Sequence, residues 1–313
     1  GLPSWSEIMS LKTALIGAGV FGGYHAGKIA ESQSATFIGV FDPDAARARE
    51  LAEKHGVKAF ESQADTLSAA DAVIIACPAI YHAETVKAAL SAGCHVLVEK
   101  PLALTGEEAM ALAALADKSD RVLQVGHQER LVLKEMGLFD LPEKPIEIEA
   151  YRESPPAPTG RAGDVSVIFD LMIHDLDMVA CLQGAASLIA GQGAIIHSGR
   201  IDQARADLVF ADGGRAMVSS SRAADERRRS MRLVFKSGEI EIDFLTRAVR
   251  NTTPFEIKAD VSESLPDPLG AADHAFFAAC LGKGPVLVPG REAAEAVRVA
   301  EALEYSIMKT TGA

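Results

Sequence analysis

Three glycines near the amino terminus have the spacing of a loop that holds phosphate groups. The segment Gly17-Ala18-Gly19-Val20-Phe21-Gly22 matches GxGxxG, follows an apolar run and opens a stretch of helical period. Gly17 permits a tight turn, Gly19 lets backbone amides approach a pyrophosphate, and Gly22 allows close packing of helix on strand. The helix amino terminus then favours the anion. The pattern predicts a dinucleotide-binding loop that includes Val20 and Phe21.

An acidic residue follows the second apolar run. Asp42 lies 20 residues after Gly22. There a carboxylate accepts hydrogen bonds from the adenosine ribose hydroxyls, whereas a 2′-phosphate would meet like charge. NAD is therefore predicted as the cofactor and NADP is disfavoured, although Arg47 and Arg49 keep NADP open. In the alternative interpretation, Asp42 only begins the Asp42-Pro43-Asp44 turn.

A lysine follows the fifth predicted strand. Lys100 stands between Glu99 and Pro101 at the carboxyl end of a parallel strand, where open α/β sheets bind ligands. Its ammonium could hydrogen-bond a substrate hydroxyl and stabilise alkoxide character as a hydride leaves the carbon. Taken alone, a lysine before proline is usually a surface residue. Its position at the strand end favours a catalytic role.

Asp170 and His174 are four residues apart, so they share one face of a helix. A carboxylate there can orient the imidazole and stabilise its cationic form, which makes His174 a candidate general base. The alternative is a helix-surface ion pair. Asp177 is expected near the same face, and Asp175 is expected to point away from it.

The first 125 residues predict the framework for these groups, because short β-branched runs alternate with stretches of helical period. Strands are predicted at Lys12-Ile16, Ala35-Phe41, Val57-Phe60, Asp71-Ala76, His95-Val98 and Arg121-Val125. Thr105 and Glu108 form a capping box before a helix. The pattern indicates a doubly wound parallel Rossmann sheet, with a domain over residues 9–126 that begins at Met9.

The second half, residues 127–313, changes to longer alternating strands with hairpin signals between them. Strands are predicted at Ile146-Tyr151, Arg205-Phe210, Ala216-Ser221, Met231-Phe235 and Glu239-Phe244. Helices are predicted at Val167-Cys181, Leu269-Leu281 and Glu292-Met308. The fold class is therefore α/β: a Rossmann domain followed by an α+β domain with a large, mostly antiparallel sheet that binds substrate.

Composition limits the function classes. The 313 residues carry a formal net charge of -12, which disfavours nucleic acid as a partner. No apolar run reaches the length of a membrane span. The four cysteines have no metal-ligand spacing, so no metal is predicted and the thiols are expected to be reduced. The amino terminus lacks a secretory pattern, and a cytoplasmic location is expected.

These motifs in their order resemble the Gfo/Idh/MocA oxidoreductases, the glucose-fructose oxidoreductase and inositol dehydrogenase family. The resemblance includes the glycine loop extended to His25, Ala76-Cys77-Pro78 with His82, the Glu99-Lys100-Pro101 triplet, Gly126-His127 and the Asp170/His174 pair. It implies catalytic Lys100, Asp170 and His174, and a cofactor site that also includes Cys77, Pro78, His82, Glu99 and Lys100. His25 and His82 could line that site or could be satisfied packing residues.

Two segments also resemble a narrower group, the UDP-N-acetylglucosamine 3-dehydrogenases. They are Arg121-Val122-Leu123-Gln124-Val125-Gly126-His127-Gln128-Glu129-Arg130 and residues 170–177. Leu131-Val132-Leu133 departs from the Phe-Asn-Pro expected there, so the substrate stays open between a nucleotide sugar and a free sugar or inositol. Substrate contacts are predicted from Lys100, His174, Arg130 and Arg161, with Arg152 as a further diphosphate anchor.

The fold by itself is also compatible with a catalytically silent NAD-binding regulator or with a scaffold protein, because one fold can serve several functions. The resemblance further implies a homodimer or homotetramer formed through the face of the second sheet that its helices leave uncovered.

Overall fold

The computed structural model describes residues 10–159 and 162–311, which form two compact units. The first comprises the residues up to Ala103, residues 107–126 and residues 267–293. The second comprises residues 104–106, 127–266 and those from Ala294 onward. The chain leaves the first unit after Gly126, where a domain boundary is predicted, but residues 267–293 return to it. The return was not predicted.

A six-stranded parallel sheet forms the centre of the first unit, with the strand order β3-β2-β1-β4-β5-β6. Its strands are β1 (Leu11–Ile16), β2 (Ala35–Phe41), β3 (Lys58–Ala59), β4 (Ala72–Ile75), β5 (His95–Val98) and β6 (Leu123–Val125). The predicted Rossmann sheet is confirmed. The order reverses at β1 and β4, so the carboxyl ends of these strands flank the crevice in which such sheets bind ligands.

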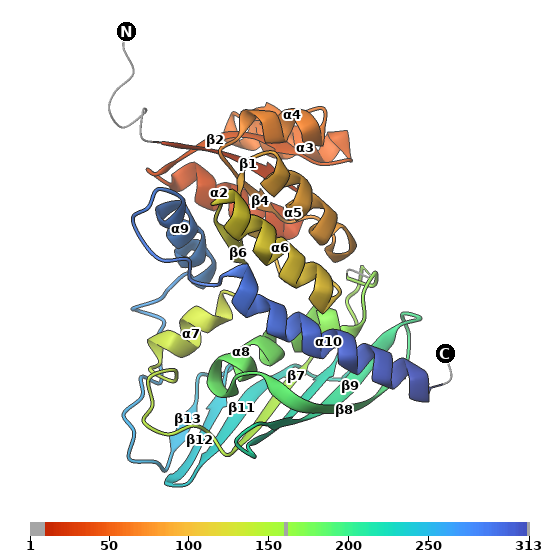
Figure 1. Cartoon of the computed structure of the whole chain (residues 1–313), viewed down its shortest axis with the longest axis vertical. Coiled ribbons are helices and arrows are strands. Elements are labelled where there is room, and N and C mark those ends of the chain that lie inside the picture. The colour runs from red at the N-terminus through yellow and green to blue at the C-terminus, as the bar shows by residue number, and fades with distance from the viewer. Residues whose placement is uncertain (1–9, 160–161, 312–313) are drawn as a thin grey trace. The chain divides into compact units, whose positions relative to one another are not determined.

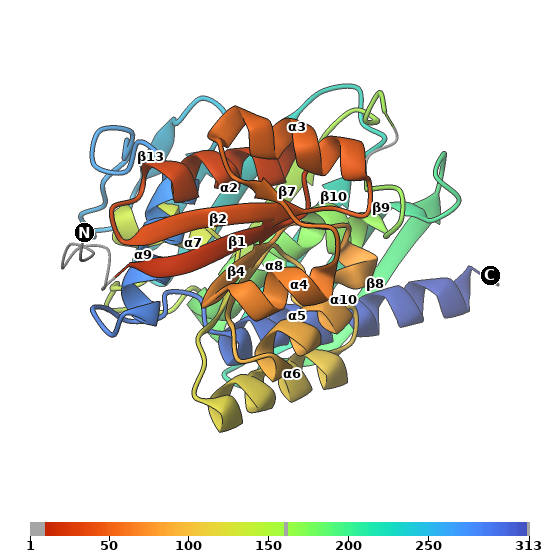
Figure 2. The same ribbon diagram turned by 90° about the horizontal axis from the view of Figure 1, so that it is seen from above.

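Helices cover both faces of this sheet. They are α2 (Val20–Glu31), α3 (Ala45–His55), α4 (Gln63–Ala69), α5 (His82–Ser91), α6 (Gly106–Ser119) and α9 (Pro268–Cys280), with a short turn η1 (Ala79–Tyr81) before α5. Figure 2 shows α2 and α3 on one face and α4, α5 and α6 on the other. Helix α6 begins directly after Thr105, as the capping-box pattern predicts.

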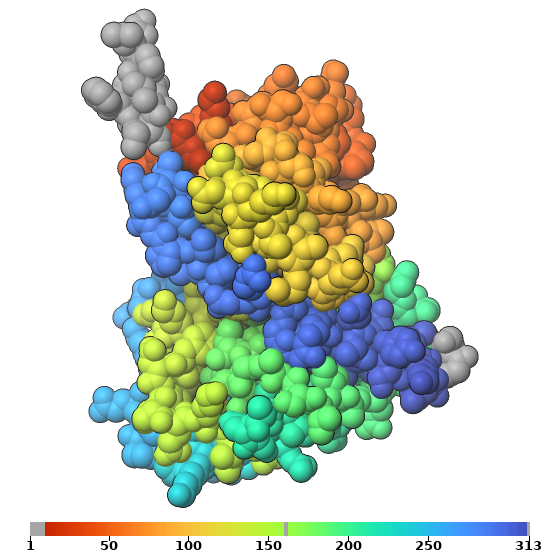
Figure 3. All heavy atoms as spheres, viewed as in Figure 1, coloured from red at the N-terminus to blue at the C-terminus, as the bar shows by residue number. Residues whose placement is uncertain are grey.

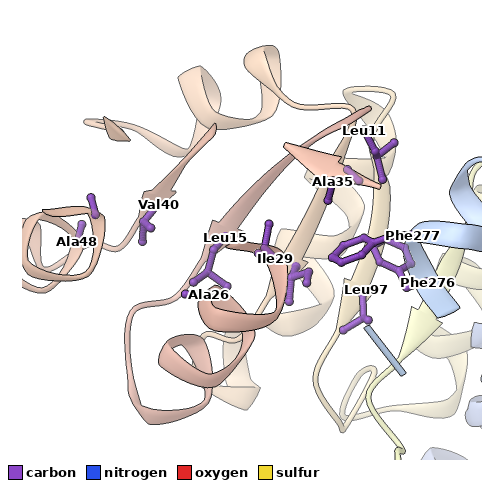
Figure 4. Packing of buried hydrophobic residues seen from close by; sticks show 13 residues of the cluster. Leu11, Leu15, Ala26, Ile29, Ala35, Val40, Ala48, Leu97, Phe276 and Phe277 are labelled. Atoms are coloured by element: carbon purple, nitrogen blue, oxygen red, sulfur yellow. The ribbon is translucent and has the colours of Figure 1, made fainter. Parts of the chain in front are cut away.

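Helix α9 belongs to the core of the first unit although it lies late in the sequence. Phe276 and Phe277 are fully buried and pack with Leu97 of β5 and Ile29 of α2 (Figure 4). Burying an aromatic side chain of this size stabilises the folded chain by about 2 to 3 kcal/mol. This apolar contact explains why residues 267–293 return to the first unit.

The second unit contains a seven-stranded sheet with the order β13-β12-β11-β7-β10-β9-β8. Its strands are β7 (Glu147–Glu153), β8 (Ala186–Ile195), β9 (Ile201–Phe210), β10 (Arg215–Ser221), β11 (Arg228–Phe235), β12 (Gly238–Asp243) and β13 (Val249–Asn251). Only the β7 and β10 pair is parallel, so the mostly antiparallel prediction is confirmed. Strands β8 and β13 were not predicted.

Helices pack on one face of this sheet. They are α7 (Glu129–Glu135), the π-helical turn η2 (Ile168–Met172), α8 (Ile173–Gln183) and α10 (Gly290–Thr310). Helix α8 and the turn η2 contact β10 (Figure 1). Residues of α10 from Ala294 onward lie at the surface of this unit (Figure 3). The sequence did not predict α7, nor that the first turn of the Val167-Cys181 helix would be π-helical.

Candidate active site

The glycine loop connects β1 to α2 and has the geometry that its sequence predicts. Gly17 has a φ of +105°, and a Cβ atom there would lie 2.5 Å from the carbonyl carbon of Ala76. A Cβ atom at Gly22 would lie 2.0 Å from the carbonyl oxygen of Gly17. A Cβ atom at Gly19, in contrast, would have no neighbour within 4 Å among the described residues. The backbone is therefore closely packed at Gly17 and Gly22, and open space remains beside Gly19.

The amino end of α2 can receive an anion. Its N-cap residue is Gly19, no side chain of the described residues caps it, and its first turn has no acidic residue. The first amides of a helix have no partner within the helix, so they are available for a phosphate group. Val20 and Phe21 follow, 53% and 42% exposed. These two residues therefore offer apolar surface beside the loop.

Asp42 follows β2 and holds the glycine loop in place. One carboxylate oxygen accepts a hydrogen bond from the Ala18 amide at 2.8 Å, and the other accepts one from the Asp44 amide at 2.8 Å. Asp42 therefore begins the Asp42-Pro43-Asp44 turn. Each carboxylate oxygen can accept a second hydrogen bond, so the turn does not prevent ribose binding.

Cys77, Pro78 and His82 follow β4. Pro78 is exposed and precedes η1. The His82 ring is buried, with Nδ1 at 2.6 Å from the Pro101 carbonyl oxygen and Nε2 at 2.8 Å from that of Cys77. Burial lowers the pKa of His82 and raises the pKa of the Cys77 thiol to about 11. Cys77 is therefore a protonated thiol at neutral pH, and His82 links two loops.

Glu99 and Lys100 follow β5. Glu99 is buried, and its Oε1 lies 2.6 Å from His25 Nε2. The other ring nitrogen, His25 Nδ1, lies 2.6 Å from Asp273 Oδ2. Lys100 is half-buried, and its peptide bond to Pro101 is cis. The packing interpretation of His25 is confirmed, and the Asp273 contact was not predicted.

In the second unit, a half-buried carboxylate of α7 faces His174. Glu129 Oε2 lies 3.7 Å from His174 Nδ1 and 2.6 Å from Arg152 Nη2, and Glu129 Oε1 lies 2.6 Å from Arg229 Nη2. Burial by itself would raise the pKa of Glu129, but Arg152, His174 and Arg229 outweigh burial and hold this pKa well below its usual value. Glu129 is therefore ionised at neutral pH. The sequence predicted no role for it.

Asp170 lies in η2, and its Oδ2 is 3.4 Å from Nη1 of Arg222. Arg222 is buried and donates from Nε to Asp202 Oδ1 at 2.9 Å. Asp202 also accepts hydrogen bonds from three backbone amides, those of residues 196, 197 and 198. No sequence pattern indicates this chain of contacts, since its members come from different elements of the unit.

Two of the three arginines predicted as diphosphate anchors are paired with carboxylates of the same unit. Arg130 is 6% exposed, and its guanidinium donates two hydrogen bonds to Asp177, at 2.7 and 2.8 Å. Arg152 likewise binds Glu129 and Asp175. The charge of both arginines is therefore matched by carboxylates inside the unit. Asp177 is therefore the ion-pair partner of Arg130, and the side chain of Asp175 is buried inside the unit. Arg161 lies outside the described residues.

Comparison with known proteins identifies the family. Residues 11–127 match the Gfo/Idh/MocA description, an oxidoreductase family with an NAD-binding Rossmann fold. The UDP-N-acetylglucosamine 3-dehydrogenase of Acidithiobacillus ferrooxidans is 35% identical over 248 residues, which cover 77% of this chain and 77% of that protein. The chain belongs to the Gfo/Idh/MocA family. It is thus a member of a dehydrogenase family that acts on CH-OH groups with NAD.

Two solved structures and a further sequence relative agree with this family. The structure of the A. ferrooxidans enzyme has a TM-score of 0.84 at 30% identity and covers 96% of this chain and 98% of that one. An inositol 2-dehydrogenase of Corynebacterium glutamicum is 32% identical over 56% of this chain and 55% of that protein. A scyllo-inositol dehydrogenase of Lactobacillus casei, solved with NAD(H) and scyllo-inositol, shares the fold, with a TM-score of 0.79 at 19% identity.

The two units of this Gfo/Idh/MocA protein divide the predicted site residues between them. The first unit contains the glycine loop, Asp42, the Cys77-Pro78 segment, Glu99 and Lys100, and the second contains Asp170 and His174. In the described part of the chain, no group of three His, Cys, Asp or Glu side chains suits a metal ion. Over the same residues, no helix is both long and apolar enough to cross a bilayer.

Proposed function

We propose that this chain is an NAD-dependent dehydrogenase that oxidises a ring hydroxyl of a nucleotide sugar, with UDP-N-acetylglucosamine oxidised at C3 as the reaction. The observation that carries the proposal is 35% identity to the A. ferrooxidans 3-dehydrogenase over 77% of both chains. Similarity to the inositol dehydrogenases extends over a smaller share of this chain. A free sugar or an inositol is therefore the second candidate substrate.

The first unit fits the cofactor. The uncapped amino end of α2 would receive the pyrophosphate, and the space above Gly19 would admit it. Asp42 would accept from the adenosine ribose and repel a 2′-phosphate, which supports NAD over NADP. When bound, NAD supplies the acceptor for a hydride from the substrate carbon.

We assign the chemistry of the hydroxyl group to Lys100, His174 and Asp170. The Lys100 ammonium donates a hydrogen bond to the hydroxyl oxygen and stabilises its developing negative charge. His174 accepts the hydroxyl proton at Nε2, because its Nδ1 faces the ionised Glu129. Asp170, which contacts Arg222, is the third residue that we assign to catalysis. Arg130 and Arg161 remain the predicted anchors for the diphosphate.

The test is formation of NADH from NAD and UDP-N-acetylglucosamine, coupled to an aminotransferase that removes a 3-keto product. N-acetylglucosamine and inositols serve as parallel substrates. We expect turnover with the nucleotide sugar alone. Turnover only with free polyols would keep the family and reject this substrate, and NAD binding without turnover of any substrate would favour the silent regulator.

Variants test the catalytic assignments. We expect Lys100→Met and His174→Ala to lose at least about 10³-fold in kcat, while NAD binding is retained. Lys118→Met and His274→Ala are matched controls, because both side chains are exposed in the first unit. Near-normal turnover by either active-site variant would show that its assignment is wrong.

The assembly and location of the protein are further parts of the proposal. The face of the seven-stranded sheet opposite η2 and α8 would pair with a second copy to give a homodimer or homotetramer. On β8, Leu188 is 66% exposed. Light scattering after gel filtration measures the assembly, and a monomer at micromolar concentration would contradict it. We place the protein in the cytoplasm.

A further inference from the structure

Two histidines of the first unit hold the chain on either side of Lys100. Before it, the Glu99 carboxylate lies 2.6 Å from His25 Nε2. After it, the Pro101 carbonyl oxygen lies 2.6 Å from His82 Nδ1. The lysine itself therefore follows a strand and stands between two buried polar contacts.

The first of these contacts belongs to a three-membered cluster, His25, Glu99 and Asp273, with exposed fractions of 1%, 8% and 1%. Two nitrogen-to-oxygen contacts of 2.6 Å each require a proton between the two atoms. The cluster therefore holds two protons and carries a net charge of -1, wherever each proton sits. Its three members come from α2, the end of β5 and α9, so it joins three elements at the residue before Lys100.

Gly126 provides room for this cluster. A Cβ atom at Gly126 would lie 2.8 Å from Glu99 Oε2, 3.0 Å from Glu99 Cδ and 3.2 Å from Glu99 Cα. A methyl group at this position would therefore displace the Glu99 carboxylate. The substitution changes no ionisable group, so it separates the position of Glu99 from its charge.

We propose that His25, Asp273 and His82 are positioning residues for Lys100, and that they fix the backbone on both sides of it so that its ammonium reaches the substrate oxygen. This inference rests on the catalytic role proposed for Lys100. An apolar cluster would connect the same three elements without the desolvation that buried charges require. Buried charge at this place is explained if the residue after Glu99 must be held within a fraction of an ångström.

The test compares graded variants of the cluster. Asp273→Asn keeps an acceptor for the His25 ring, whereas Asp273→Leu removes it, and Gly126→Ala displaces Glu99. His274→Gln is the matched control, because it removes an exposed histidine-carboxylate pair, with Glu31, from the same helix. We expect kcat to fall about 10²-fold in Asp273→Leu and Gly126→Ala, because an ångström of misplacement has an effect of this size. The affinity for NAD should stay within about twofold in Asp273→Leu. Asp273→Asn should retain most of the activity.

A second readout does not require the substrate. The lysines are dimethylated with carbon-13 methyl groups, which keeps their charge, and the Lys100 signal is assigned by its loss in Lys100→Arg. In the presence of NAD, we expect this signal to move in Asp273→Leu and Gly126→Ala but not in His274→Gln, while signals of the other lysines stay in place. Unchanged signals from the other lysines would show that the variants alter the surroundings of Lys100 and not the whole protein.

The outcomes separate the two proposals. If UDP-N-acetylglucosamine is not turned over but the Lys100 signal moves as described, the proposed substrate fails and the positioning role stands. An unchanged Lys100 signal in both Asp273→Leu and Gly126→Ala overturns the positioning role, as does a kcat within twofold of wild type. Thermal melts exclude unfolded variants, and Gly126→Ala against wild type keeps the comparison decisive if Asp273→Leu does not fold.

Discussion

Because of the buried cluster around His25, the folded protein should become less stable as the pH rises above neutrality. Burial by itself would lower the pKa of His25, but its contacts with Asp273 and Glu99 outweigh burial and raise the pKa from 6.5 to about 10. At about 1.4 kcal/mol for each tenfold change in proton affinity, this rise corresponds to about 5 kcal/mol of folding free energy. Burial also raises the pKa of Asp273 despite the nearby histidine. We take the cluster as holding its two protons at pH 7, since both contacts measure 2.6 Å.

The direction of the effect follows from proton binding. The folded chain holds a proton that the unfolded chain releases near pH 6.5, so the contribution is complete below pH 6.5. It falls by about 1.4 kcal/mol for each pH unit above 6.5 and is lost as the pH rises through about 10. The protein should therefore lose stability steadily between about pH 7 and about pH 9.5.

The assay is urea unfolding at a series of pH values over that range. The reference is the triple variant His25→Gln/Glu99→Gln/Asp273→Asn, because a single His25 variant would leave two buried carboxylates that take up protons themselves. Thiols such as Cys94, whose pKa burial raises to about 11, titrate in both proteins and cancel. We expect the free energy of unfolding of the wild type to fall more steeply than that of the reference, by about 1.4 kcal/mol per pH unit. If the free energies of unfolding of the two proteins fell with pH at the same rate, the raised pKa of His25 would be refuted.

Three further predictions concern single side chains. Glu129→Gln leaves the buried Arg152 and the partly buried Arg229 without their shared carboxylate, and we expect urea unfolding to show a loss of about 3 kcal/mol, against no more than about 0.5 kcal/mol for the more exposed Glu241→Gln. Phe276→Ala opens a cavity in the core of the first unit and should cost about 3 to 5 kcal/mol in the same assay; a loss under about 1 kcal/mol would contradict the packing of α9. Asp42→Asn removes the charge that repels a 2′-phosphate, so the ratio of kcat/KM for NAD to that for NADP should fall about tenfold or more, and an unchanged ratio would assign cofactor choice elsewhere.

The first unit could be predicted closely because its signals are local. Strands β2 and β5 occupy the predicted residues, and the glycine loop has the expected turn, since fully buried parallel strands and glycine turns leave marks in consecutive residues. Strand β8 leaves no such mark. Its Gly191 and Gly193 have weak strand propensity, and they are required because Leu303 and Ile307 of α10 approach their backbone.

The candidate site was predictable where a motif is contiguous and not where a contact is remote. Lys100 and His174 stand in recognisable segments. Asp273, in contrast, meets His25 across 248 positions of sequence, and only the packing of α9 on the first sheet brings them together. A carboxylate on an apolar helix was the one available sign, because an aspartate beside buried phenylalanines has to find a partner.

The register of the second sheet explains why Glu129 faces His174. Strands β7 and β11 pair so that Arg152 and Arg229 stand directly opposite each other, and like charges in this relation repel. Glu129 binds both guanidinium groups at 2.6 Å and compensates the repulsion. Its carboxylate is thereby fixed from the sheet side, with Nδ1 of His174 at 3.7 Å on the helix side. An arginine pair that looks unfavourable in the sheet thus supplies a rigid anion beside the proposed base, where a carboxylate on a mobile loop would lose its orientation.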